Sequence, residues 1–241
     1  MRHASLLALA ASIAAATTTA AEPKRQAGDI MFGTTRASKI LFLGNSITKH
    51  GPSAKIGWTG NWGMAASAED NDYVHRVLDA IAAETGTTPD SMVVNIATFE
   101  RNYTDYDIAG KLKSVFDFNA DLVVLAIGEN VPAPKTDQDK TTFKACVKAL
   151  VDRLKAGGDP TIVVRTSFWA NETKDTILKQ VCDEAGGVFV DAGPLGRDEK
   201  NYARSEREYK HKGVAAHPGD RGMKAIADAI LAAIKPAEEQ R

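Results

Sequence analysis

The chain alternates short apolar runs with longer segments in which apolar residues recur every three or four positions. The short runs are mainly aliphatic and predict β-strands at residues 39–43, 91–96, 121–127, 161–166 and 187–190. The periodic segments predict amphipathic helices at residues 73–84, 108–118, 141–155, 171–185 and 220–234. Residues 121–127 form the most apolar run, so this strand is expected at the centre of a sheet.

This order of elements predicts an α/β fold. Strands that alternate with helices favour a parallel sheet covered on both faces. Right-handed crossovers then give a three-layer, flavodoxin-like arrangement with a five-stranded parallel sheet. Residues 22–241 are expected to form this one domain, with residues 22–37 as a polar arm laid over it. Ligands of such sheets bind beyond the carboxyl ends of the strands, which is where chemistry is expected.

The first residues are typical of an export signal. Arg2 and His3 precede an Ala- and Leu-rich run at residues 6–16, which is too short to span a bilayer. Small residues at 19–21 offer a cleavage site, so residues 1–21 are predicted to be a signal peptide. The protein is therefore expected in the periplasm or secreted. No cysteine follows the leader at a lipidation position, so no membrane anchor is expected.

Composition and motifs limit the classes of partner, metal and cofactor that are expected for this protein. Lys and Arg total 30, Asp and Glu total 31, and the formal net charge is −1, which gives no reason to expect nucleic acid as a partner. The sequence has no His- or Cys-rich cluster at ligand spacing and no phosphate-binding loop, so neither a metal nor a cofactor is expected. Pairing of Cys146 with Cys182 and the oligomeric state stay open.

Three short blocks place reactive side chains just after predicted strands or before the last helix. Residues 44–48 (GNSIT) form a tight turn that exposes Ser46. Residues 126–130 (AIGEN) bring Asn130, a hydrogen-bond donor, after the central strand. Residues 216–220 (AHPGD) contain His217, and histidine is the side chain best suited to take a proton from serine near neutral pH. Taken singly, each block is also typical of an ordinary turn or helix cap.

Together the three blocks resemble those of the SGNH (GDSL-like) hydrolase family, in the same order and on the same elements. The resemblance implies the SGNH hydrolase fold and an acyl-enzyme mechanism in which Ser46 attacks an ester carbonyl. It implies that the Ser46 N–H and the Asn130 side chain hold the oxyanion. It also implies that His217 moves the proton from Ser46 to the leaving alcohol. Asn45 stands where this family most often has Asp.

The family usually has an Asp three residues before the histidine, and here that position is Val214. We therefore expect a Ser–His dyad in which a backbone carbonyl or a more distant acid holds the second ring nitrogen of His217. Glu206, Glu208 and Asp220 are near in sequence, and the choice among them stays open.

The family's second block also differs. Residues 95–102 (NIATFERN) lack the glycine whose N–H usually completes the oxyanion hole. A backbone N–H between residues 97 and 100, or that of Gly63, is the expected substitute.

Residues 50–72 form a Gly-rich segment that carries Trp58 and Trp62 and begins close to Ser46. We expect it to fold over the site, where the two indole rings would bind sugar rings; ordinary packing within a loop is the alternative. Trp169, after the fourth predicted strand, is expected at the same edge of the sheet.

The sequence thus predicts an exported serine esterase acting on small-molecule or glycan esters, with deacetylation of carbohydrates as the specific hypothesis. A glycoside hydrolase on the same scaffold is one alternative, since Glu100 and Glu129 both follow strands and would bind substrate as paired carboxylates. A non-catalytic glycan-binding protein is another, because Val214 replaces the orienting acid.

Overall fold

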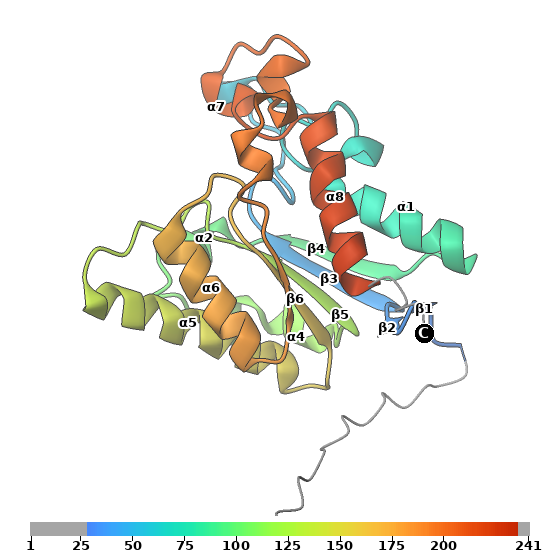
Figure 1. The fold of residues 1–241 in the computed structure, drawn as a ribbon, viewed down its shortest axis with the longest axis vertical. Helices are drawn as coiled ribbons and strands as arrows, with labels where there is room; N and C mark the ends of the chain where they lie inside the picture. Colours follow the sequence, from blue (N-terminus) through green and yellow to red (C-terminus); the bar gives the residue numbers. More distant parts are fainter. Residues whose placement is uncertain (1–27, 236–241) are drawn as a thin grey trace, which may run out of the picture.

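The computed structural model describes residues 28–235, so the predicted signal peptide at residues 1–21 lies outside the described residues. The centre of the described domain is a five-stranded parallel sheet in the order β4-β3-β5-β6-β7 (Figure 1). The strands are β3 (Lys39–Gly44), β4 (Asp90–Asn95), β5 (Leu122–Ala126), β6 (Thr161–Arg165) and β7 (Val188–Val190). The predicted fold class is confirmed, and the most apolar strand, β5, is central and buried throughout.

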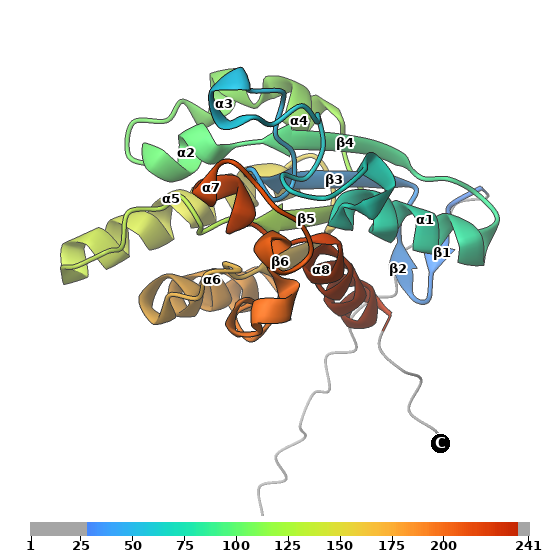
Figure 2. The ribbon, with the colours of Figure 1, turned by 90° about the horizontal axis from the view of Figure 1, so that it is seen from above.

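Helices cover both faces of the sheet and give three layers (Figures 1 and 2). One face carries α1 (Tyr73–Thr85) and α8 (Asp220–Ile234). The other carries α4 (Lys113–Asp117), α5 (Asp137–Lys155) and α6 (Glu172–Glu184). Alternate residues of a strand point to opposite faces. Accordingly, Ile40 and Phe42 of β3 pack under α1 and α8, whereas Leu41 and Leu43 join the core under α5 and α6.

Helix boundaries follow local capping. Asp72 accepts a hydrogen bond from the His75 N–H at the start of α1, and Gly86 ends that helix with a φ of 72°. Helix α5 begins four residues before the predicted start at residue 141, because Thr136 and Asp139 form a capping box.

Three parts of the fold differ from the sequence predictions. The predicted helix at residues 108–118 is two short helices, α3 (Ile108–Lys111) and α4, separated by Leu112. The expected polar arm contains a two-stranded antiparallel hairpin, β1 (Met31–Phe32) and β2 (Thr35–Arg36). Short helices also occur where none was predicted: α2 (Ala97–Arg101), α7 (Lys212–Ala215), η1 (Ala54–Ile56), η2 (Glu69–Asn71), η3 (Leu195–Arg197), η4 (Glu199–Asn201) and η5 (Ala203–Ser205).

Two long connections meet beyond the carboxyl ends of the strands, at the top of Figure 1. Residues 45–72 follow β3, and residues 191–219 lead from β7 to α8. The Ala65 carbonyl joins them by accepting hydrogen bonds from the Arg207 guanidinium at 2.9 Å and the Tyr209 hydroxyl at 3.0 Å. This edge of the sheet therefore carries both Ser46 and His217.

Within residues 28–235, no helix has the length and apolar character needed to cross a membrane. Cys146 and Cys182 are both free thiols.

Candidate active site

Ser46 lies in the turn that follows β3. The Asn45 carbonyl accepts hydrogen bonds from the Thr48 and Lys49 N–H groups at 3.0 and 2.9 Å, and the Asn45 side-chain oxygen accepts one from the Ile47 N–H at 3.1 Å. A Cβ at Gly44 would overlap the Thr48 hydroxyl, so only glycine allows the chain to turn this sharply. The hydrogen bonds that Asn45 accepts thus shape the turn and hold Ser46 at the edge of the sheet.

His217 lies between α7 and α8 and meets Ser46 directly. The Ser46 Oγ and the His217 Nε2 are 2.8 Å apart. On the other side of the ring, Nδ1 is 2.7 Å from the Gly213 carbonyl oxygen. A carbonyl only accepts hydrogen bonds, so Nδ1 carries the proton of the neutral ring. Nε2 then has the free lone pair that a general base needs toward Ser46.

The third member of this arrangement is a backbone carbonyl, one of the two options that the sequence left open. Val214, at the family's Asp position, is only 3% exposed and packs in the small cluster with Trp58 and Met64. Two of the three nearby acids are engaged elsewhere: Asp220 binds Arg207 and Ser67, and Glu206 accepts the N–H groups of residues 220 and 221. The third, Glu208, is exposed.

Burial controls the protonation of His217. It lowers the pKa of His217 to about 4, against the opposing effects of the Gly213 hydrogen bond and of the Glu129 charge. Trp169 contributes to this burial, because its ring packs edge-on against the imidazole with centroids 5.2 Å apart, and its indole N–H donates to the Ala216 carbonyl at 3.2 Å. His217 is therefore neutral at pH 7 and able to accept a proton.

Asn130 follows β5 after Gly128, whose φ is 125°. The Asn130 side-chain nitrogen donates to Glu100 at 2.8 Å, and its oxygen accepts from Arg101 at 2.9 Å, so the two contacts fix the orientation of the amide. Only one of the two amide hydrogens is needed for Glu100, which leaves the other for a ligand. Among the described residues, the Ser46 N–H donates to no group. The family resemblance implies these two donors for the oxyanion hole, and that role stays a prediction.

The additional oxyanion donor proposed from the sequence does not fit this geometry. The Gly63 N–H donates to the buried Asp72 carboxylate at 2.9 Å, so it is not available to a substrate. Two amides of the alternative stretch are also engaged: the Ala97 N–H donates to Asn95 at 2.9 Å, and the Glu100 N–H donates to Ile96 at 3.2 Å.

Glu100 and Glu129 were expected to bind substrate, and the structure corrects this. Glu100 is 0% exposed, and the Glu129 side chain is 1% exposed. Glu100 accepts hydrogen bonds from the Gly128 N–H at 2.6 Å and from Asn130, while Glu129 forms an ion pair with Arg165 at 2.8 Å. Burial, followed by the charge of Glu129, raises the pKa of Glu100. Both carboxylates are therefore interior groups beneath the site, which removes the basis for the glycoside hydrolase alternative.

Trp58 and Trp62 pack against each other, with ring centroids 5.7 Å apart. The Trp58 indole N–H donates to the His50 carbonyl at 2.8 Å, and the ring is 8% exposed. Part of it lines a cavity of about 450 Å³, together with Tyr209, His211 and other residues of the two long connections. Loop packing accounts for most of the Trp58 surface, and Trp62 is the more exposed ring of the pair.

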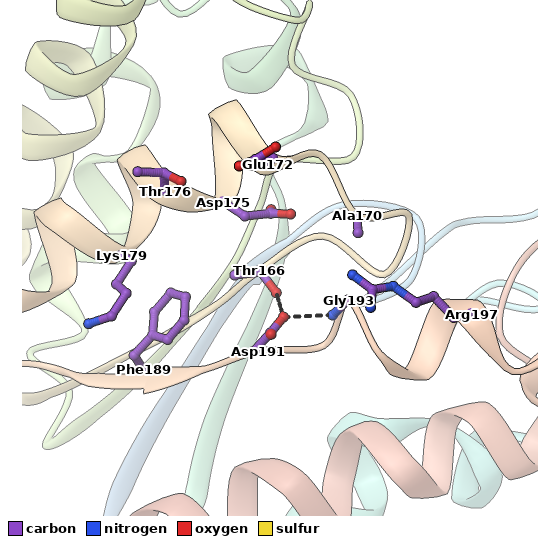
Figure 3. Close-up of a pocket in the computed structure, with 10 residues that line it drawn as sticks. All are labelled: Thr166, Ala170, Glu172, Asp175, Thr176, Lys179, Phe189, Asp191, Gly193 and Arg197. Carbon is purple, nitrogen blue, oxygen red and sulfur yellow. Dashed lines mark hydrogen bonds between the residues drawn. The ribbon is translucent and has the colours of Figure 1, made fainter.

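A second cavity, of about 370 Å³, lies at the carboxyl ends of β6 and β7 (Figure 3). Asp191 lies in its floor, where it accepts hydrogen bonds from the Thr166 hydroxyl at 3.1 Å and from the Gly193 N–H at 2.9 Å. Phe189 and Arg197 line its sides. The cavity shares the edge of the sheet with Ser46 but does not include it.

A serine hydrogen-bonded to a neutral imidazole, at the carboxyl edge of a three-layer α/β sheet, defines the site of a serine hydrolase. The model of the GDSL-like Lipase/Acylhydrolase family matches residues 42–225. The chain belongs to this family, and its predicted membership is confirmed.

Solved structures agree on the fold. A two-domain esterase active on acetylated mannans has 18% identity and a TM-score of 0.53, with 84% of this chain and 51% of that chain covered. The acetyl xylan esterase AlAXEase has 18% identity and a TM-score of 0.51, with 81% of this chain and 98% of that chain covered. At such identities the likeness establishes the fold alone. A comparison with curated proteins found no match.

Proposed function

We propose that this protein is a serine esterase that hydrolyses carboxylic esters through an acyl-enzyme formed on Ser46. The observation that carries the proposal is the 2.8 Å contact between the Ser46 Oγ and the His217 Nε2, in a ring whose Nδ1 proton is held by the Gly213 carbonyl. That pairing is the arrangement that activates a serine hydroxyl.

The reaction follows from these contacts. Ser46 Oγ attacks the ester carbonyl as its proton passes to the His217 Nε2, and the resulting oxyanion accepts hydrogen bonds from the Ser46 N–H and the Asn130 amide. His217 then gives the proton to the leaving alcohol, and the acyl group stays on Ser46. A water molecule, deprotonated by the same ring, releases the acid and restores Ser46. In both steps the Gly213 carbonyl stabilises the positive ring.

We further propose that the esters are acetylated carbohydrates and that the protein acts in the periplasm or outside the cell. Support comes from two structural neighbours that are esterases active on acetylated mannans and acetyl xylan. It also comes from the two cavities at the edge of the sheet, which contain aromatic rings beside charged side chains. The predicted signal peptide supports the location, where such polymers are met.

The proposal is tested with p-nitrophenyl acetate and the Ser46→Ala and His217→Ala variants, with Ser91→Ala, an exposed serine of β4, as the matched control. We expect turnover in the wild type and the control and near-complete loss in the two site variants. Release of acetate from acetylated xylan and mannan oligosaccharides then tests the substrate class. Cleavage of simple esters with no acetate release from any saccharide would refute the carbohydrate part.

The non-catalytic binding alternative makes the opposite prediction for Ser46. An activated serine reacts quickly with a phosphonate directed at serine hydrolases, whereas an ordinary hydroxyl does not. Covalent labelling of the wild type, lost in Ser46→Ala and in His217→Ala, supports the esterase. A wild type that binds acetylated saccharides but neither turns over nor labels would establish a binding protein.

A further inference from the structure

The buried Glu129 carboxylate connects three segments that surround the reacting atoms. One oxygen accepts hydrogen bonds from the Arg165 guanidinium at 2.8 Å and from the Phe168 N–H at 3.0 Å. The other accepts a hydrogen bond from the Asn45 side chain at 2.7 Å. A single side chain from the loop after β5 thus holds the turn after β3 and the loop after β6.

Each connection leads to a residue of the dyad. Asn45 directly precedes Ser46, and its side-chain oxygen accepts from the Ile47 N–H at 3.1 Å, so the bond to Glu129 fixes the turn on both sides of the nucleophile. On the other side, Phe168 directly precedes Trp169, whose ring packs edge-on against His217.

Charge explains why this arrangement is stable in the interior. Arg165 is fully buried in β6, and its ion pair with Glu129 provides the countercharge that a buried guanidinium requires. Burial acts to lower the pKa of Arg165, but the charges around it, that of Glu129 foremost, more than offset this and raise it. The ion pair makes the hydrogen bond between Arg165 and Glu129 a charge-assisted one, which is the stronger kind.

We propose that Glu129 is a positioning residue that sets the geometry of Ser46 against His217 through Asn45 and the Phe168 N–H. The inference rests on the proposed esterase function. Glu129 does not touch substrate. It holds the turn that contains Ser46 and the loop that contains Trp169 in fixed positions relative to each other, and so maintains the hydrogen bond between Ser46 and His217.

The perturbation is Glu129→Gln, which keeps the shape of the side chain but replaces one acceptor oxygen with a donor nitrogen. If the oxygen of the new amide keeps Arg165 and the Phe168 N–H, its nitrogen faces the Asn45 nitrogen, donor against donor. Asn45 cannot turn over without losing its bond from the Ile47 N–H. We expect kcat to fall on the order of 100-fold, as for other small displacements of reacting groups, with little change in KM.

A second substitution provides the rescue. Asn45→Asp alone places a carboxylate against Glu129 and Glu100, which contact Asn45 at 2.7 and 3.3 Å, so it should be damaging. When Asn45→Asp is combined with Glu129→Gln, the amide nitrogen introduced at position 129 would donate to the carboxylate introduced at position 45, and the connection would be restored. We expect the double variant to be more active than the product of the two single effects predicts, which a double-mutant cycle measures.

The control is Glu184→Gln, an exposed carboxylate at the last residue of α6 and outside both cavities, which should keep wild-type kcat. Should Glu129→Gln fail to fold, Asn45→Ala breaks the same connection and leaves the buried ion pair in place, and it should lower kcat alone. The acid limb of kcat/KM gives a further readout. The Glu129 charge raises the pKa of His217, whereas His50 and His211 lower it, so the limb should move to lower pH in Glu129→Gln.

The two proposals fail in different ways. A wild type without turnover or phosphonate labelling would overturn the esterase function and this inference with it. An active wild type in which Glu129→Gln lowers the melting temperature but keeps kcat would overturn the inference alone, because Glu129 would then be merely structural. Strictly additive effects of the two substitutions would also overturn it.

Discussion

Acidification should lower the free energy of unfolding of this protein by an amount that follows from the pKa of His217. The pKa of this ring is about 4 in the folded protein, whereas the ordinary histidine value of 6.5 applies to the unfolded chain. The unfolded state therefore binds the proton more tightly, and protonation favours unfolding. The stabilisation is fully present above about pH 6.5 and is lost as the pH falls toward about 4, and over that window it amounts to about 3 kcal/mol.

The measurement is urea unfolding of the wild type and of His217→Gln at about pH 7.5 and about pH 4, because only the wild type carries the titrating ring. Other acid-sensitive groups, Glu100 and Asp175 among them, are present in both proteins and cancel in the difference. We expect the wild type to lose about 3 kcal/mol more than the variant between the two conditions.

The same ring governs activity. Because a general base works only when deprotonated, the acid limb of kcat/KM should lie near pH 4 rather than near the ordinary histidine value. An acid limb near pH 6.5, together with equal pH dependence of unfolding in wild type and variant, would contradict a buried His217 whose pKa is about 4. It would mean that water reaches the ring and that Trp169 does not seal it.

Two further substitutions test other parts of the site. Gly128→Ala should lower the free energy of unfolding by about 2–4 kcal/mol in urea titrations, because the φ of 125° is unfavourable for alanine and the new Cβ would overlap the Ser167 hydroxyl; a variant as stable as the wild type would contradict this. Val214→Asp should cost about 1–3 kcal/mol by burying a polar group, without raising kcat, because Gly213 already holds the Nδ1 proton of His217. A clear rise in kcat would show that the carbonyl is an inadequate replacement for the family's acid.

The sheet was predictable because its signal is local. Each strand is a short apolar run, and the most apolar one is central. The break at Leu112 was not predictable from periodicity. Leu112 and Val115 both remain buried in the core under α5, so the apolar pattern persists although the helical hydrogen bonding changes there. The very short helices were not predicted for a related reason, since a helix of one turn is too short to show a periodic repeat of apolar residues.

The site was predictable where side chains carry the chemistry. Ser46, Asn130 and His217 stand in recognisable blocks, and the structure brings the first and the last into contact. The role of the Gly213 carbonyl was not predictable, because every residue has a backbone carbonyl. The only sign of it in the sequence is the missing Asp at position 214. The ion pair between Arg165 and Glu129 did leave a signal. An arginine at the end of an apolar strand needs a buried carboxylate near it, and this requirement would have placed Glu129 in the interior.

The Gly213 carbonyl and the burial of His217 together determine how strong a base His217 is. A carbonyl dipole stabilises a charged imidazole less than a carboxylate does, and burial behind Trp169 disfavours the charge further, so the pKa of His217 stays far below neutrality. A base this weak accepts a proton less readily at pH 7 than a histidine with an adjacent carboxylate. The short contact between Ser46 and His217 must then come from precise placement, and Glu129 is the group that joins the segments responsible for it. The same weakness keeps the ring deprotonated in acid, so such a site should retain its activity at pH values where an ordinary histidine base is already protonated.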